Sequence, residues 1–270
     1  MATKRILVTG AGSGFAEGAV VGMAQQGHTI IATVEISPQV TALRRKIAEL
    51  GLENKVTVEK LNILDSYDVN AAVRDWDIDV LWSHAGIGES GPSSEVPLDR
   101  VRHNFEVNVF APLDLVQKFV KKWINQGHAG KIVFTSSMGG LFTPSWFGPY
   151  VSTKHALESF AEALRDELKP FGIKVQTINP GAYLTGFNET LAENAFKWLD
   201  DERNFNKRAD VQAGFDALLG NDDGRLDPQE MIDAMIRIVP SDTGKFRNVV
   251  PAFVERMLKE SQAAAWDVEI

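Results

Sequence analysis

Short apolar runs and longer amphipathic stretches alternate along the first 180 residues of the chain. The apolar runs are rich in valine and isoleucine and predict buried β-strands. Between them, apolar residues recur at helical spacing, which predicts amphipathic helices. The strands are expected at residues 5–9, 29–34, 55–60, 80–83, 131–135 and 173–178, and the helices at 15–26, 38–50, 66–74, 98–126 and 149–171.

This alternation of strand and helix predicts the fold class. Strands joined by right-handed helical crossovers form a parallel sheet with helices on both faces. We therefore expect an α/β protein in which residues 1–270 form a single-domain doubly wound parallel sheet, the Rossmann fold. In such sheets the ligand binds beyond the carboxyl ends of the strands.

The alternation lapses after Pro180. Residues 183–220 are rich in aromatic and charged side chains and predict helices or loops rather than further sheet. We expect residues 183–226 to form a lid within the domain that binds substrate and orders over bound cofactor. Residues 248–251 could add a last short strand.

The segment after this expected lid predicts a helix start. Asp227 is a favourable N-cap, Pro228 suits the first helical turn, and Glu230 completes a capping box. Part of a calcium-binding loop fits the same region, but its first ligand position falls on Leu219, which cannot bind calcium. We therefore favour the helix start and expect no metal site. The partial calcium match involves Asn221, Asp223, Gly224, Leu226 and Glu230.

Composition narrows the classes of function. The chain is 44% hydrophobic and 24% charged, which is typical of a folded globular protein. Its formal net charge of -8 disfavours nucleic acid and anionic membranes as partners. The absence of cysteine excludes disulfides, thiolate catalysis and cysteine-based metal sites, and it fits a reducing compartment. No apolar signal region precedes the first strand, so we expect a cytoplasmic protein without a membrane partner.

A glycine-rich turn follows the first predicted strand. Glycines at this place let the backbone turn tightly and approach a pyrophosphate, although such a turn can also be purely structural. The N-terminus of the next helix adds free N–H groups and the positive end of the helix dipole. The turn therefore predicts a dinucleotide site that contains Gly10, Gly12, Ser13, Gly14 and Phe15.

Glu35 stands at the end of the second predicted strand, about where an acid contacts the adenosine ribose in dinucleotide-binding folds. A carboxylate there accepts hydrogen bonds from the ribose hydroxyls and repels a 2′-phosphate. No arginine or lysine adjoins it. This favours NAD over NADP, although Glu35 could instead be a solvated acid at a strand end.

Tyr150 and Lys154 lie four residues apart in a predicted helix, so their side chains share one face. Ser137 stands at the end of the preceding strand. A tyrosinate can take the proton of a carbinol while hydride leaves, but free tyrosine titrates at about pH 10. We expect Lys154 and a bound nicotinamide ring to lower that pKa, and Ser137 to hold the substrate oxygen.

The order and spacing of these residues resemble the short-chain dehydrogenase/reductase family. Ser137, Tyr150 and Lys154 match its catalytic serine, tyrosine and lysine, and Asn108 matches its helix asparagine. Ser136 competes for the serine position, but Ser137 keeps the family's distance to the tyrosine. The resemblance implies that Asn108 positions a water that relays protons from Lys154. It also implies that Tyr150 and Lys154 contact the cofactor.

The resemblance extends to the cofactor side. The glycine-rich turn that begins at Thr9 is similar to that of the family, with Ala16 in place of a third glycine. Ser83 and His84 stand where the family usually has two asparagines, and we interpret His84 as structural. The resemblance further implies cofactor contacts from Asn62, Ile63, Ala85, Gly86, Pro180, Gly181 and Thr185.

Aromatic side chains flank the expected catalytic residues. In a sheet of this kind these segments border the substrate cleft, so we expect an apolar pocket for a bulky or aromatic secondary alcohol or ketone. Many of the aromatic rings could instead belong to the core. The pocket candidates are Phe142, Trp146, Phe147, Tyr183 and Phe187, with Phe196 and Trp198 nearby.

Together these residues predict an oxidoreductase that transfers a hydride between NAD(H) and a secondary alcohol or ketone. Two alternatives stay open: an NADPH-dependent carbonyl reductase of the same fold, and a non-catalytic dinucleotide-binding regulator. The complete set of Ser137, Tyr150, Lys154 and Asn108 argues against the regulator. The resemblance also implies a homodimer or homotetramer, commonly formed by pairing the helices expected at 98–126 and 149–171.

Overall fold

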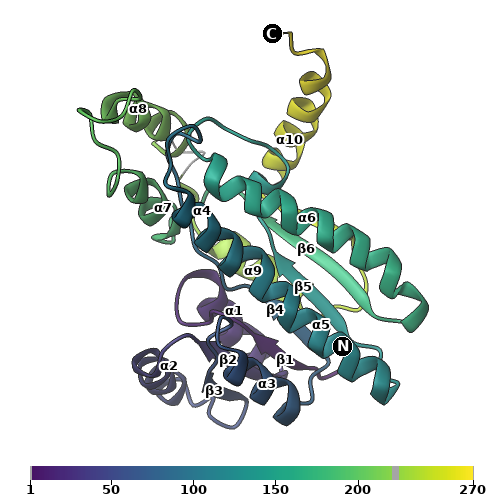
Figure 1. The fold of residues 1–270 in the computed structure, drawn as a ribbon. Helices are drawn as coiled ribbons and strands as arrows, with labels where there is room; N and C mark the ends of the chain where they lie inside the picture. The colour runs from purple at the N-terminus through teal and green to yellow at the C-terminus, as the bar shows by residue number, and fades with distance from the viewer. Residues whose placement is uncertain (1, 221–224, 270) are drawn as a thin grey trace.

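Seven parallel strands form one sheet in the computed structural model, which describes residues 2–220 and 225–269 (Figure 1). Their spatial order is β3-β2-β1-β4-β5-β6-β7, so the chain begins in the middle of the sheet and reverses direction once. This confirms the predicted doubly wound fold and the last short strand. The strands are β1 (Arg5–Val8), β2 (Thr29–Val34), β3 (Val56–Lys60), β4 (Val80–Ser83), β5 (Lys131–Thr135), β6 (Lys174–Pro180) and β7 (Arg247–Val250).

Helices cover both faces of the sheet because successive strand residues point to opposite faces and both faces are apolar. In β1, Ile6 and Val8 join one hydrophobic cluster, while Leu7 between them joins the other. The first cluster packs under α1 (Gly14–Gln25), α2 (Ser37–Glu49) and α9 (Gln229–Ile238). The second packs under α3 (Ser66–Asp75), α5 (Ala111–Gln126) and α6 (Gly148–Leu168).

The helix expected at residues 98–126 is divided in the structure. It consists of α4 (Leu98–Phe105), a π-helical turn (Glu106–Phe110) and α5. The π turn contains Asn108, whose side chain bonds the backbone of Ile87 instead of pointing to solvent. Single π turns inside α-helices are frequent at functional sites. Apolar periodicity does not reveal such a turn, because one extra residue barely disturbs the buried face.

The segment expected as a lid contains two helices, α7 (Phe187–Ala195) and α8 (Arg208–Leu219). A parallel bridge between Tyr183 and Leu226 joins its two ends. A third hydrophobic cluster packs these helices against Phe147 and Tyr150 of α6 and the loop before it. In Figure 1 both helices lie beyond α4, at the edge of the sheet that contains the carboxyl end of β6. This position suits a substrate lid, and that role stays a prediction.

Asp227 closes the turn that leads into α9. Its Oδ1 accepts a hydrogen bond from the backbone N–H of Gln229 at 2.9 Å. The predicted helix start after the expected lid is confirmed in place, but the N-cap residue is Pro228 rather than Asp227, and the predicted capping box with Glu230 is not formed. The partial calcium loop cannot be compared in the same way, since Asn221, Asp223 and Gly224 lie outside the described residues, as does that part of the expected lid.

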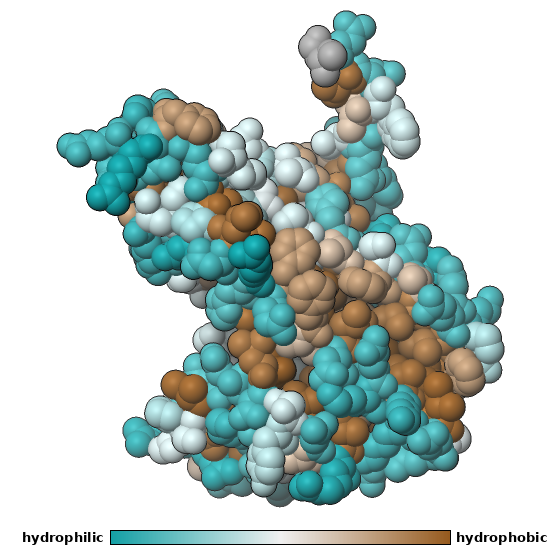
Figure 2. All heavy atoms as spheres, viewed as in Figure 1, coloured by the Kyte–Doolittle hydropathy of each residue, from teal (hydrophilic) through white to brown (hydrophobic). Residues whose placement is uncertain are grey.

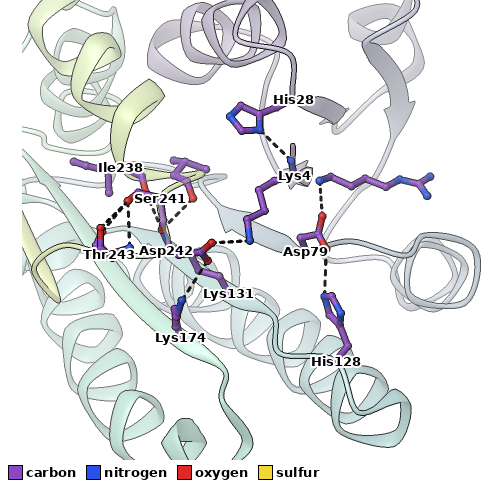
Figure 3. A network of polar contacts seen from close by, with 12 residues as sticks. Lys4, His28, Asp79, His128, Lys131, Lys174, Ile238, Ser241, Asp242 and Thr243 are labelled. Carbon is purple, nitrogen blue, oxygen red and sulfur yellow. Dashed lines mark hydrogen bonds and ion pairs between the residues drawn. The ribbon is translucent and has the colours of Figure 1, made fainter. Parts of the chain in front are cut away.

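A polar network closes the amino edge of the sheet, opposite the ligand edge (Figure 3). Lys131 of β5 is buried, and its Nζ donates to the carbonyl oxygens of Ile238 at 2.7 Å and Ser241 at 2.6 Å. The lysine thereby ties the C-terminal end of α9 to the central sheet. Burial lowers the pKa of Lys131 to about 7. Asp242, the residue after Ser241, forms an ion pair with Lys4, with 2.9 Å between its Oδ2 and the lysine Nζ.

The last helix, α10 (Ala252–Ala264), extends away from the body of the molecule in Figure 1. Its first half is anchored, because Val254 and Leu258 are buried. Trp266 lies beyond it and is 91% exposed. Among the helices of the described part of the chain, none combines the length and apolar character needed to cross a bilayer.

Candidate active site

The glycine-rich turn joins β1 to α1 in the middle of the sheet's carboxyl edge. Gly10 and Gly14 have φ angles of 70° and 61°, a region that residues with a side chain rarely adopt. A Cβ on Gly10 would lie 2.8 Å from the Cα of Ala85, so the turn is wedged against the segment after β4. A Cβ on Gly12 would lie 3.2 Å from Cγ1 of Val34. The first N–H groups of α1 open onto this turn after Ser13, an arrangement that binds phosphate groups.

Two threonines brace the ends of the central strands around Ser83 and His84, the two residues that stand where the family usually has asparagines. Thr9 Oγ1 accepts hydrogen bonds from the backbone N–H groups of His84 and Ala85, both at 3.0 Å. Thr135 Oγ1 accepts from Trp82 Nε1 at 2.8 Å and lies 2.9 Å from Nδ1 of His84. Burial and, secondarily, a nearby lysine lower the pKa of His84 to about 3. A neutral, hydrogen-bonded ring fits the structural interpretation of His84.

The strand ends on the adenosine side carry the expected contact residues. Glu35 follows β2 and is exposed, and its backbone N–H donates to Oε1 of Gln39 at 3.1 Å. Asn62 follows β3, and its Oδ1 accepts from the N–H of Leu64 at 3.0 Å. This oxygen, expected to contact the cofactor, therefore already closes a local turn and keeps one lone pair for a ligand. The side chain of Ile63 packs into the core, which leaves its backbone for a cofactor contact.

The segment after β6 returns toward the start of α1. Pro180 ends the strand, and the N–H of Gly181 donates to the carbonyl of Val250 at 2.8 Å. Thr185 lies beside the glycine-rich turn, since a Cβ on Gly14 would be 3.9 Å from Cβ of Thr185. The structure thus brings the cofactor contacts expected after β6 close to the predicted pyrophosphate turn.

Tyr183 does not line the substrate pocket, which corrects the expectation for this residue. It is 1% exposed and belongs to the cluster beneath α1 and α9. Its ring packs edge-on against Phe15, with 5.4 Å between ring centres. The bridge to Leu226 fixes the backbone so that the side chain enters the core. Phe15 likewise packs its ring against that core while its backbone begins α1.

Ser137, Tyr150 and Lys154 come together at the carboxyl edge of the sheet. Ser137 follows β5 and caps a 3₁₀ turn (Met138–Gly140), where its Oγ accepts from the N–H of Gly139 at 3.0 Å. Its side chain also acts on the hydroxyl of Tyr150 and lowers the pKa of that group. Tyr150 and Lys154 share one face of α6, and Lys154 Nζ lies 5.7 Å from the centre of the tyrosine ring. Lys154 Nζ also donates to the backbone oxygen of Thr135 at 3.0 Å. Ser136, the competing serine, is buried with its hydroxyl unpartnered.

Asn108 joins this group from the π turn. Its Oδ1 accepts from the N–H of Ile87 at 2.9 Å, and its Nδ2 donates to the carbonyl of the same residue at 2.8 Å. A Cβ on Gly86 would lie 3.1 Å from Asn108 Oδ1 and 3.6 Å from Lys154 Nζ. Asn108 Nδ2 also donates to Thr153 Oγ1 at 3.0 Å. The water relay that the resemblance implies stays a prediction.

Burial dominates the electrostatics of the catalytic pair. It raises the pKa of Tyr150 above its ordinary value, and the hydrogen bond from Ser137 only partly opposes this. It lowers the pKa of Lys154 to about 8, although the negative charge of Glu158 acts in the other direction. In the protein without cofactor, desolvation disfavours the phenolate, and the expectation that Lys154 and a bound nicotinamide ring together lower this pKa stays a prediction. Near neutral pH the site holds a protonated phenol beside a charged lysine.

The aromatic residues on the substrate side have different roles. Phe187 of α7 lies against Tyr150, with 5.5 Å between ring centres. Phe147 is buried against Phe215 of α8, at 5.1 Å, so it belongs to the packing beneath the expected lid. Trp146 has a positive φ of 72° and stacks over Gly214 of α8, where a Cβ would lie 2.2 Å from its Cδ1. Phe142 is partly buried, Phe196 packs on Phe215, and Trp198 donates to Glu89.

The structure adds residues that the sequence pattern did not single out. Glu158 lies one helical turn beyond Lys154 and is buried, with partners Asn179 and Arg247. Glu95 holds the loop between α7 and α8 through four hydrogen bonds. The sequence could have indicated Glu158, since it is an acid on the same helix face as Tyr150 and Lys154. The sequence could not have indicated Arg247 or Glu95, because their hydrogen-bond partners are distant in the chain.

The chain belongs to the short-chain dehydrogenase family, whose model, described as short chain dehydrogenase, matches residues 4–195. It is 33% identical over 242 residues to the uncharacterised oxidoreductase YusZ of Bacillus subtilis, covering 88% of this chain and 85% of the relative. It is 27% identical over 270 residues to a 3-ketodihydrosphingosine reductase of Bacteroides thetaiotaomicron, covering 97% and 93%. A short-chain dehydrogenase structure from Streptomyces avermitilis superimposes with a TM-score of 0.78 at 24% identity, covering 98% and 95%. The family consists of oxidoreductases that bind NAD(P).

Proposed function

We propose that the protein is an NAD(H)-dependent alcohol dehydrogenase or ketoreductase in which Tyr150 is the acid/base. The observation that carries this proposal is the convergence of Ser137, Tyr150 and Lys154 beside Gly86, at the edge of the sheet where the glycine-rich turn also lies. A dinucleotide fits this edge, because Gly10 and Gly12 leave backbone exposed where any side chain would collide with neighbouring residues.

In the reductive direction, Ser137 donates a hydrogen bond to the carbonyl oxygen of the substrate and holds it beside Tyr150. A reduced nicotinamide held at this edge would supply the hydride that the carbonyl carbon receives. The hydroxyl of Tyr150 gives its proton to the developing alkoxide, and the charge on Lys154 stabilises the phenolate left behind. Oxidation reverses these transfers, with Tyr150 taking the alcohol proton. Asn108 keeps the segment after β4 in place through its paired bonds to Ile87.

The preference for NAD rests on Glu35. Its carboxylate lies at the exposed end of β2, on the same edge as the glycine-rich turn. Ribose hydroxyls can donate to it, whereas a 2′-phosphate would be repelled. The alternative, an NADPH-dependent carbonyl reductase, would need a cation available to a 2′-phosphate at this strand end. Lys60 lies opposite Val34 in the sheet but is paired with Asp68 at 2.7 Å.

A bulky apolar secondary alcohol or ketone is the substrate class we propose. Phe187 lies directly against the ring of Tyr150, and the hydrophobic cluster around it continues into α7 and α8. Such a lining favours apolar groups next to the reacting carbon. The relative named for 3-ketodihydrosphingosine supports a large ketone.

We also propose that the chain forms a homodimer or homotetramer through the helices α4, α5 and α6. Figure 2 shows apolar surface gathered over this side of the molecule. Leu98 of α4, Phe110 at the end of the π turn before α5, and Phe160 of α6 are exposed, at 64%, 52% and 39%. Light scattering on the purified protein would test the proposal, and a mass of 29.7 kDa would contradict it.

Replacement of the acid/base tests the proposed function. With a panel of secondary alcohols and ketones followed by nicotinamide absorbance, Tyr150→Phe should lower kcat by roughly a hundredfold to ten-thousandfold. The affinity for NADH should stay nearly unchanged. Tyr67→Phe is the matched control, because Tyr67 is 79% exposed on α3 and should not affect turnover. A Tyr150→Phe variant that keeps most of its activity would refute the mechanism, and a wild type that binds NADH without turning over any substrate would favour the regulator.

A further inference from the structure

An acid is buried directly behind the candidate catalytic pair. Glu158 lies on α6, four residues after Lys154 and eight after Tyr150, so all three share one face of the helix. Its side chain is only 5% exposed. A buried carboxylate must be paired and hydrogen-bonded to persist. Its Oε1 accepts from Asn179 Nδ2 at 2.6 Å, and its Oε2 accepts from Arg247 Nε at 2.9 Å.

Glu158 reaches the expected catalytic serine through Asn179. The same Nδ2 of Asn179 also donates to the backbone oxygen of Ser137 at 3.1 Å. The turn after Ser137 packs against the aliphatic part of the Glu158 side chain, since a Cβ on Gly140 would lie 3.0 Å from Cγ of Glu158. The position of the serine therefore depends on where this side chain is held.

Glu158 also supplies negative charge near Lys154. That charge raises the pKa of the lysine against the larger effect of burial, which brings it to about 8. The other titratable groups facing Lys154 are neutral: burial lowers the pKa of His84 and raises that of Tyr150. Glu158 is therefore the negative charge on which the protonation of Lys154 depends, and Arg247 moderates it from β7.

Stability alone does not account for this arrangement. Buried ion pairs contribute little net stability compared with apolar residues of the same shape, because desolvation offsets their attraction. We propose that Glu158 is a positioning residue of the site, whose carboxylate fixes the Ser137 turn through Asn179 and places a negative charge one helical turn behind Lys154. This inference rests on the proposed function for its catalytic meaning, and its physical content is measurable without turnover.

The titration of Lys154 itself is the decisive measurement. In protein labelled at the lysine side-chain carbons, the Cε signal of Lys154 is followed by NMR against pH and assigned by its loss in Lys154→Met. Glu158→Gln should lower the midpoint by about one pH unit, because an opposite charge is removed. Arg247→Gln should raise it, because the carboxylate then acts on Lys154 without its counter-charge.

The matched control is Glu162→Gln. Glu162 lies on the next turn of α6 and is 55% exposed, with a contact of 3.7 Å to Arg247. Its replacement should leave the midpoint of Lys154 unchanged. Water screens a charge at that exposure far more than it screens the buried Glu158.

Kinetics should follow the titration. In the reductive direction, kcat/KM should fall at high pH as Lys154 loses its proton. The pH at which it falls should be lower in Glu158→Gln and higher in Arg247→Gln than in the wild type. Glu158→Gln should also lower kcat at least tenfold at every pH, because the Ser137 turn loses its support, while KM for NADH stays constant.

Shifts of the Lys154 midpoint in opposite directions in the two variants distinguish a positioning role from a loss of folding stability. A loss of stability alone would move neither midpoint. An unchanged Lys154 midpoint in Glu158→Gln, or shifts of the same sign in both variants, would overturn the inference. If Glu158→Gln does not fold, Arg247→Gln decides alone, since its midpoint must rise. A wild type without turnover would defeat the proposed function but would leave the NMR result to decide this inference.

Discussion

The cofactor side and the substrate side of the site are built by different means. On the cofactor side, backbone meets backbone: the glycine-rich turn at Gly10 lies against Ala85, and Thr9 bonds the N–H groups that follow β4. On the substrate side, side chains meet side chains, with Phe187 against Tyr150 across the base of α7. Backbone contacts require glycine at fixed spacing, so they leave a motif, whereas side-chain packing accepts many residues and leaves none.

One carboxylate attaches the expected lid to the body. Glu95 accepts hydrogen bonds from the backbone N–H groups of Phe205 at 2.9 Å and Asn206 at 3.0 Å, and from Asn204 Nδ2 at 2.9 Å. Burial acts to raise the pKa of Glu95, but these bonds outweigh it and lower the pKa to about 2. The attachment is therefore charged at every pH at which the enzyme would work.

Among three substitutions that compare the two sides, the largest effect is expected on the cofactor side. Gly10→Ala places a Cβ at positive φ and 2.8 Å from the backbone of Ala85, so the turn must move. Strain of this kind costs about 1–3 kcal/mol, which corresponds to a loss of NADH affinity of up to roughly a hundredfold in a fluorescence titration. Gly27→Ala is the control, because Gly27 has a φ of 96° but no atom within 4 Å of an added Cβ. Equal losses in both variants would mean that contact with Ala85 is irrelevant.

A smaller effect is expected from a substitution of Glu35, at the adenosine end of the cofactor side. Glu35→Ser removes the charge that would repel a 2′-phosphate, so the ratio of kcat/KM for NADP to that for NAD should rise about tenfold. Glu59→Ser, at the end of the neighbouring strand β3, serves as control. If the ratio for Glu35→Ser stays at the wild-type value, the cofactor preference is set elsewhere.

The smallest effect is expected on the substrate side. Glu95→Gln replaces one accepting oxygen by an NH₂ group that faces the donors of residues 204–206. KM for the ketone should rise roughly threefold to tenfold, as for the loss of one or two hydrogen bonds, while NADH affinity stays constant. Glu202→Gln, an exposed acid of the same segment, is the control. A loss of NADH affinity instead would assign this segment to the cofactor side.

The sequence predicted the sheet well because each strand is a short apolar run bounded by turn residues. It also predicted that Ser137, Tyr150 and Lys154 would meet, since a strand end and one helix face are local features. Their catalytic roles stay predictions. Tyr183 was assigned to the wrong surface, because its orientation depends on a bridge to Leu226 that no local pattern encodes.

Two other features were hidden for the same reason. The π turn around Asn108 interrupts a helix whose apolar periodicity continues across it. The surroundings of Glu158 come from three separate elements, because α6 carries the acid while Asn179 lies on β6 and Arg247 on β7. Sequence spacing predicts contacts within an element, and these contacts are between elements.

The placement of Arg247 on the edge strand has a consequence for biosynthesis. Ribosomes deliver the chain from its amino end, and segments begin to fold as they emerge. Six of the seven strands and all four expected catalytic residues appear before β7. Until that strand docks, a nascent molecule can close its nucleotide-binding half while Glu158 lacks its guanidinium partner. The surroundings of Glu158 in the candidate site are therefore complete only when the edge strand has joined the sheet.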